Sequence, residues 1–117
     1  MAPCTVDEAL TEMELLDYDF HLFTEKGTHT AGLLYRGEPT GYRLALVAPS
    51  LAGELSPFTA LVTISPHPPP CIRAEDAPSR LRLLGLPFLF FIDAALGQAC
   101  VLYSRYDGHY GVITPAN

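Results

Sequence analysis

The last third of the chain places the strongest constraint on the fold. Three apolar runs, Phe88–Ile92, Ala99–Tyr103 and Tyr110–Ile113, follow one another with short separations. The second separation contains Asp107-Gly108. Asp-Gly between two apolar runs is a strong hairpin signal, because glycine readily adopts the positive φ that a tight turn needs. The pattern therefore predicts an antiparallel three-stranded meander.

A short helix is expected directly before this meander, from about Ala77 to Leu84. Pro78 fits only the first turn of a helix, which places the N-cap at Asp76. Gly85 follows the last helical residue, where a left-handed C-terminal cap is common. The sequence therefore predicts a helix of about two turns.

The first part of the chain predicts the same order of elements. Thr5-Val6-Asp7-Glu8 is a capping box, in which the threonine hydroxyl and the glutamate carboxylate satisfy each other's backbone amides. Apolar residues then recur at helical spacing, which predicts a helix from about Val6 to Leu16. Three predicted strands follow at Asp19–Thr24, Thr28–Arg36 and Tyr42–Val47.

An internal repeat relates these two parts. A shift of 68 residues without gaps places residues 4–45 over 72–113. The shared F-x-x-F and L-Y signals keep one phase over the whole alignment, which is the signature of a duplicated structural unit. The identical pairs include Ala9 and Ala77, Leu15-Leu16 and Leu83-Leu84, Phe20 and Phe88, Phe23 and Phe91, Leu34-Tyr35 and Leu102-Tyr103, and Tyr42 and Tyr110.

One repeat cannot bury its own sheet. Phe88, Phe90 and Ile92 point to one face while Leu89 and Phe91 point to the other, so both faces are apolar. One helix covers one face, and a large apolar face left in water is rare in a monomer. We therefore expect an α+β fold of two helix-plus-three-stranded antiparallel sheet repeats, packed sheet to sheet as an intramolecular pseudo-dimer. The residues expected in this inter-repeat packing are Phe20, Phe23, Tyr35, Phe88, Phe91, Tyr103 and Tyr110.

The domain prediction follows from the repeat. Residues 1–49 form repeat 1 and residues 72–117 form repeat 2. Between them, residues 50–71 are expected to be a linker that begins as a loop at Ser50–Ser56. The alternating, β-branched stretch Phe58–Ser65 is predicted to be an extra strand preceding repeat 2. Pro66–Pro70 cannot join a ladder and should be extended.

Composition excludes several classes of function. A net charge of −6 disfavours a free-standing DNA or RNA binder, which needs a basic face. Apolar runs are too short for a membrane-spanning helix, and the first residues do not resemble a signal peptide. Cys4, Cys71 and Cys100 form no CxxC pair, which favours a reducing cytoplasm.

Catalytic and metal sites are not indicated. His21, His29, His67 and His109 have no metal-ligand spacing with the cysteines. No nucleophile has a base at recognisable spacing. We therefore expect no cofactor, no metal and no enzymatic activity.

Two segments resemble a known family. Asp7–Phe23 and Tyr103–Pro115 resemble the C-terminal domain of long-form ribosome hibernation promoting factors, the sigma-54 modulation protein family. That family carries an acidic helix start, M-E-L-L, an F-x-x-F strand and a Y-x-R-x-D-G-x-Y-G-x-I ending. Repeat 1 lacks the Asp-Gly turn in its ending, Tyr35–Tyr42, and repeat 2 lacks the helix sequence. The tandem arrangement resembles actinobacterial hibernation and dormancy factors.

The resemblance implies a non-enzymatic role in translation silencing. In the family, an N-terminal domain blocks the decoding region of the small ribosomal subunit, and the C-terminal domain self-associates to pair ribosomes. Here self-association is expected to be mainly intramolecular, and the parent protein is expected to bind the small subunit. Arg105, Tyr106 and His109 at the Asp-Gly turn are the candidate ribosome contacts. The alternatives are a protein-interaction or regulatory domain that does not act on the ribosome, and a sensor with a ligand pocket between the repeats.

Overall fold

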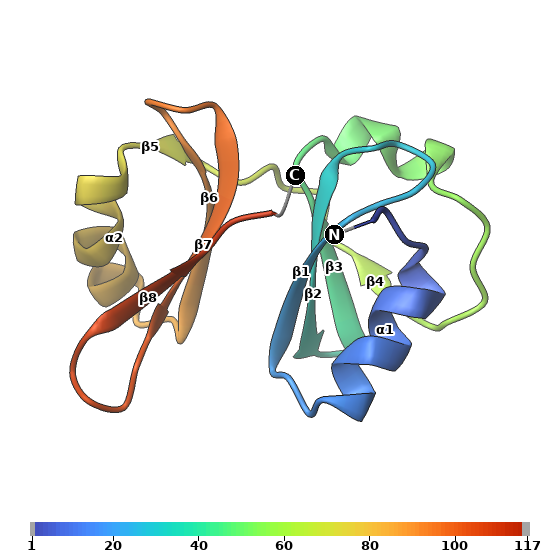
Figure 1. The fold of residues 1–117 in the computed structure, drawn as a ribbon, viewed down its shortest axis with the longest axis horizontal. Helices are drawn as coiled ribbons and strands as arrows, with labels where there is room; N and C mark the ends of the chain where they lie inside the picture. The colour runs from blue at the N-terminus through green and yellow to red at the C-terminus, as the bar shows by residue number, and fades with distance from the viewer. Residues whose placement is uncertain (1, 116–117) are drawn as a thin grey trace. The chain divides into compact units, whose positions relative to one another are not determined.

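A computed structural model describes residues 2–115 of the chain (Figure 1). The chain divides after Pro68 into two compact units, each with its own four-stranded sheet. The first unit contains α1 (Val6–Leu15), β1 (Phe20–Thr24), β2 (Ala31–Gly37), β3 (Gly41–Leu46), the 3-10 helix η1 (Pro49–Glu54) and β4 (Thr63–Ile64). The second contains β5 (Cys71–Ile72), the 3-10 helix η2 (Ala74–Asp76), α2 (Ala77–Leu84), β6 (Phe88–Asp93), β7 (Gln98–Ser104) and β8 (Tyr110–Ile113).

The first unit is a sheet with α1 on one face (Figure 1). The order is β1-β2-β3-β4, with antiparallel pairs up to β3 and β4 parallel to β3. The predicted capping box starts α1: the Thr5 hydroxyl accepts from the Glu8 amide at 3.1 Å, and the Glu8 carboxylate accepts from the Thr5 amide at 2.9 Å. The apolar stripe of α1 then packs on the side chains that β1, β2 and β3 point toward the helix. This core consists of Val6, Ala9, Met13, Phe23, Leu34, Leu44 and Leu46.

The second unit repeats this design with a shorter helix. Its sheet order is β5-β6-β7-β8, with β5 parallel to β6 and the predicted meander antiparallel. The α2 helix has the predicted bounds and ends at Gly85 with φ of 64°. The Asp76 side chain makes no capping hydrogen bond, and η2 leads into the helix instead. The core consists of Ala77, Leu81, Leu89, Phe91, Cys100 and Leu102.

The 68-residue repeat is confirmed by backbone features that were not predicted. Cys4 pairs in parallel with Glu25, and Ile72 pairs in parallel with Asp93 at the equivalent positions. Left-handed residues also coincide. Asp17 and His29 have φ of 53° and 55°, and their repeat equivalents are Gly85 and Gly97, both with φ of 64°. The two units therefore share helix ends and strand turns as well as element order.

The segment between the repeats differs from the sequence expectation. The predicted loop at Ser50–Ser56 is largely η1, and the predicted strand over Phe58–Ser65 is regular only at Thr63–Ile64. This strand extends the first sheet and does not precede the second one. The strand Cys71–Ile72 was not expected. The alternating pattern failed because only Thr63–Ile64 reach a free strand edge. The preceding residues 52–62, named here the crossing segment, run past the start of α1 and pack on the core.

Two carboxylates of the first unit anchor that crossing segment. Asp7 on α1 accepts hydrogen bonds from the amides of Thr59 and Ala60, both at 2.8 Å. Glu25 accepts from the amide of Ser56 at 2.9 Å. These bonds hold the segment against the core of the first unit. Its apolar residues that pack on this core are Ala52, Leu55, Phe58 and Val62, followed by Ile64 of β4.

Candidate interaction surfaces

The predicted ribosome contacts lie together on the turn between β7 and β8. The Arg105 amide donates to the His109 carbonyl at 2.8 Å, and Gly108 has φ of 86°. The carboxylate of Asp107 lies 3.6 Å from the Arg105 guanidinium and accepts from the His109 amide at 3.0 Å. The Tyr106 side chain is fully exposed. The turn thus presents a cation, an aromatic ring and an imidazole to solvent.

Each unit has one apolar sheet face that its own helix does not cover. In β1 and β2 this face carries Phe20, Leu22, Leu33 and Tyr35, as strand alternation and register require. None of these residues belongs to the core under α1. The second unit repeats the arrangement at Phe88, Phe90, Val101 and Tyr103, none of which belongs to the core under α2.

The seven residues expected between the repeats therefore separate into two groups. Phe23, Phe91 and Tyr110 lie on the helix-covered faces, where each packs within its own unit. This placement corrects the expectation for those three, because the sequence could not tell which face the helix would cover. Phe20, Tyr35, Phe88 and Tyr103 lie on the opposite faces. Inter-repeat packing stays a prediction for these four.

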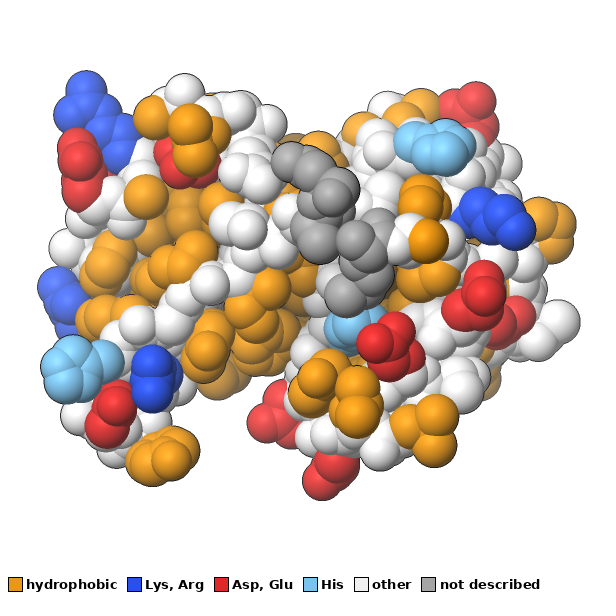
Figure 2. Space-filling model, viewed as in Figure 1, with side chains coloured by type: hydrophobic (Ala, Val, Ile, Leu, Met, Phe, Trp, Pro, Cys, Tyr) orange, Lys and Arg blue, Asp and Glu red, His pale blue; other side chains and the backbone are white. Residues whose placement is uncertain are grey.

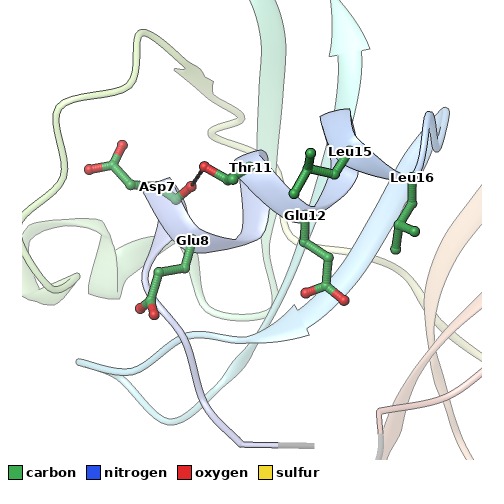
Figure 3. A pocket seen from close by; sticks show the side chains of 6 residues that line it. All are labelled: Asp7, Glu8, Thr11, Glu12, Leu15 and Leu16. Atoms are coloured by element: carbon green, nitrogen blue, oxygen red, sulfur yellow. Dashed lines mark hydrogen bonds between the residues drawn. The ribbon is translucent and has the colours of Figure 1, made fainter.

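A further surface lies along the outer side of α1. A groove of about 500 Å³, named here the α1 groove, is lined by Asp7, Glu8, Thr11, Glu12, Leu15 and Leu16. Figure 3 shows Glu8, Glu12 and Leu16 projecting to the same side of the helix. The Leu15 side chain is 80% exposed and that of Leu16 is 51% exposed. Acidic and apolar groups therefore meet in one groove.

The acidic charge is concentrated in the first unit. Residues 2–68 contain nine Asp or Glu and three Lys or Arg, whereas residues 69–115 contain four of each. Figure 2 shows more acidic side chains over the first unit than over the second. The net charge of −6 thus belongs to the unit that carries the α1 groove.

Comparison with known proteins assigns the family. The family described as "Sigma 54 modulation/S30EA ribosomal protein C terminus" matches residues 1–44 and 60–112. The chain belongs to this family. The first matched segment contains α1, β1 and β2, and the second contains α2, β6 and β7. The S30EA C-terminal match therefore covers elements of both repeats.

Two kinds of relative match this S30EA C-terminal chain. A protein of Mycobacterium tuberculosis named "Dormancy associated translation inhibitor" is 40% identical over 114 residues, which are 92% of this chain and 42% of that protein. A protein of Picosynechococcus sp. named "Ribosome hibernation promotion factor" is 37% identical over 54 residues, which are 46% of this chain and 27% of that protein. The chain thus spans less than half the length of either relative.

Metal ligands, membrane spans and reactive thiols are the other kinds of site that residues 2–115 could form. Within this range, no group of three His, Cys, Asp or Glu side chains could hold a metal ion. No helix in the same range is long and apolar enough to cross a membrane. Burial raises the pKa of the Cys4 and Cys100 thiols, and nearby carboxylates raise both further. Both thiols are therefore held in the protonated form, which is the less reactive one.

Sequence reasoning did not find the α1 groove. Helix capping accounts for Asp7 and Glu8 in the sequence, and helical spacing places Leu16 on the apolar stripe of the helix. The structure corrects this placement, because Leu16 lies just after α1 and is 51% exposed. A signal was available, because six acidic residues and no basic residue occur between Asp7 and Asp19. That run exceeds what one helix start needs for its dipole.

Proposed function

We propose that this chain is a non-enzymatic interaction domain of a ribosome hibernation or translation-silencing factor, and that it contains two tandem copies of the family's dimerisation unit. Membership of the S30EA C-terminal family supports the proposal, as do relatives named for translation inhibition and ribosome hibernation. The single observation that carries the tandem arrangement is the structural duplication of the two units, down to their left-handed residues.

The apolar sheet face opposite the helix of each unit supports an internal pairing. On this face Phe90 and Val101 are buried although they do not belong to the core under α2, and burying apolar surface contributes roughly 25 cal/mol per Å². The other repeat offers a face of the same kind, and the connection keeps its local concentration in roughly the millimolar range. We infer that Phe20, Tyr35, Phe88 and Tyr103 pack between the two sheets.

The exposed turn between β7 and β8 is the proposed contact with the ribosome. Its guanidinium, imidazole and tyrosine ring suit a surface of RNA phosphates and bases, since Arg binds phosphate and aromatic rings stack on bases. The parent protein is proposed to act on the small subunit. No catalytic step is required, because occupying a surface of the ribosome is enough to silence it.

Co-sedimentation with purified ribosomes tests this function. The chain should pellet with ribosomes through a sucrose cushion at low salt. The triple variant Arg105→Ala, Tyr106→Ala, His109→Ala should pellet several-fold less. The control is Leu96→Ala, at an exposed residue on the turn between β6 and β7. A chain that stays in the supernatant would favour an interaction domain that does not act on the ribosome.

A further inference from the structure

We propose that the α1 groove binds a protein segment rich in Lys and Arg that also carries aliphatic side chains. The leucines would receive the aliphatic groups and the carboxylates would receive the cations. The proposal rests on the proposed function only in placing the chain at the ribosome. Ribosomal proteins carry basic segments that neutralise rRNA phosphates.

The apolar part of the groove is not needed by the core of the unit. Val6, Ala9 and Met13 form the buried stripe of α1 and are fully buried. Leu15 and Leu16 lie at the end of the same helix and remain largely exposed. Two neighbouring exposed leucines at the end of a groove can be desolvated by a partner, which is how apolar anchors contribute to binding.

The carboxylates of the α1 groove have mostly neutral hydrogen-bond partners. Asp7 is bonded only by neutral groups of Thr59 and Ala60, which leave its negative charge unbalanced. Hydrogen bonds from the Thr5 amide and hydroxyl lower the pKa of Glu8, so this side chain stays ionised at neutral pH. Among residues 2–115, no Lys or Arg forms an ion pair with the three groove carboxylates. The nearest basic groups are the imidazole of His21, 3.5 Å from the Glu12 carboxylate, and Lys26, whose charge also lowers the pKa of Glu8.

The second unit repeats the leucine pair of the α1 groove but not the acidic residues Glu12 and Glu14. Leu83 and Leu84 occupy the positions of Leu15 and Leu16 and are also exposed, by 85% and 52%. The charges differ, because Arg80 and Arg82 stand where the first unit has Glu12 and Glu14. The two helices therefore offer the same apolar pair in opposite electrostatic settings, and only α1 suits a basic partner.

A second copy of this chain is the competing occupant. Its α2 would bring two arginines beside a leucine pair. However, the Arg82 guanidinium already donates to the Tyr110 hydroxyl at 3.1 Å and to the Ser79 hydroxyl at 3.4 Å. A two-turn helix with one uncommitted arginine matches the acidic groove less well than a segment with several cations. Charge complementarity therefore favours a basic segment from another protein.

Peptide titration tests the proposal. The probe is a short synthetic peptide in which Lys, Leu and Arg alternate, and the control peptide has Ser in place of Leu. Binding to the intact chain, followed by isothermal calorimetry, should be measurable for the first peptide and clearly weaker for the second. Higher salt should weaken it further, because screening reduces attraction between exposed charges.

Matched variants locate the binding. Glu12→Arg with Glu14→Arg copies the residues of the second unit and should weaken peptide binding about tenfold or more. Leu15→Ser with Leu16→Ser should do the same, whereas Leu83→Ser with Leu84→Ser should have no effect. Circular dichroism confirms folding of each variant. Equal affinity of wild type and the Glu12→Arg, Glu14→Arg variant would overturn the proposal.

Two further measurements distinguish this proposal from its alternatives. Concentration-dependent doubling of mass, abolished by substitution of either leucine pair, would overturn the proposal in favour of a second copy. Ribosome co-sedimentation of the wild-type chain, set beside its peptide binding, distinguishes the two proposals. If the wild-type chain pellets with ribosomes but binds no peptide, this inference fails and the proposed function stands. If the chain binds peptide but does not pellet, the proposed function fails alone.

Discussion

The carboxylate of Glu25 accepts a hydrogen bond from the backbone amide of Ser56 at 2.9 Å. This bond joins the turn after β1 to the crossing segment. The same carboxylate accepts from the amide and the hydroxyl of Thr28, at 2.7 and 2.9 Å. Glu25 is fully buried. One side chain therefore fixes both its own turn and a segment about thirty residues away.

We expect Glu25→Ala to lower the free energy of unfolding by about 3 kcal/mol. Removing the carboxylate leaves buried amides without an acceptor, and each unsatisfied group costs about 1–3 kcal/mol. Urea unfolding followed by circular dichroism measures the change. The control Glu14→Ala, at an exposed position on α1, should stay within about 0.5 kcal/mol of wild type. Equal losses in the two variants would contradict the role assigned to Glu25.

The stability of the first unit should decrease in acid. Burial alone would raise the pKa of Glu25, but the hydrogen bonds from Thr28, Ser56 and Gly27 outweigh it and lower the pKa. A carboxyl with a lowered folded-state pKa stabilises the fold above its unfolded pKa, and this contribution is lost as the pH falls through the folded value. Urea midpoints should therefore drop below about pH 4.3. Glu25→Gln should lose less over the same range.

Gly27 is required by a close approach of backbone. A Cβ at this position would lie 2.5 Å from the Ser56 amide nitrogen and 2.7 Å from the Glu54 carbonyl oxygen. We expect Gly27→Ala to cost about 1–3 kcal/mol, because a rigid backbone must move. Gly53→Ala is the matched control, since nothing lies within 4 Å of its Cβ. Thermal melting compares them, and a wild-type melt for Gly27→Ala would contradict the packing of the crossing segment.

Phe91 is the central aromatic side chain of the second core and is fully buried. Phe91→Ala should cost about 3–5 kcal/mol, which is enough to unfold a domain of ordinary stability. Tyr106→Ala, at a fully exposed residue, should melt like wild type. A wild-type melt for Phe91→Ala would mean that the assigned sheet face is wrong.

The proposed internal pairing of the two repeats predicts a monomer of 12.7 kDa. The connection holds the two halves at an effective concentration of roughly millimolar, which free chains at micromolar concentration do not reach. Light scattering coupled to size exclusion measures the mass. A stable species of twice this mass at micromolar concentration would indicate that the sheet faces pair between chains, for example by exchange of a whole repeat.

Much of the fold could be predicted because its signals are local. The capping box at Thr5, the glycine after Leu84 and the Asp107-Gly108 turn each act within a few residues, and all three occur where expected. The 68-residue shift also indicated which helix and strands of the first unit correspond to those of the second. The α1 groove could not be derived this way, because exposure of Leu15 depends on which helical stripe the core takes.

The sequence by itself determined the two helices, the two three-stranded meanders and their relation by 68 residues. Tertiary structure alone decided that Thr63–Ile64 adds to β3, that Cys71–Ile72 adds to β6, and that the helices cover Phe23 and Phe91. The physical reason is the range of the interactions. Caps, turns and alternation are fixed by neighbours in the chain, whereas a free strand edge and a buried face exist only after distant segments have packed together.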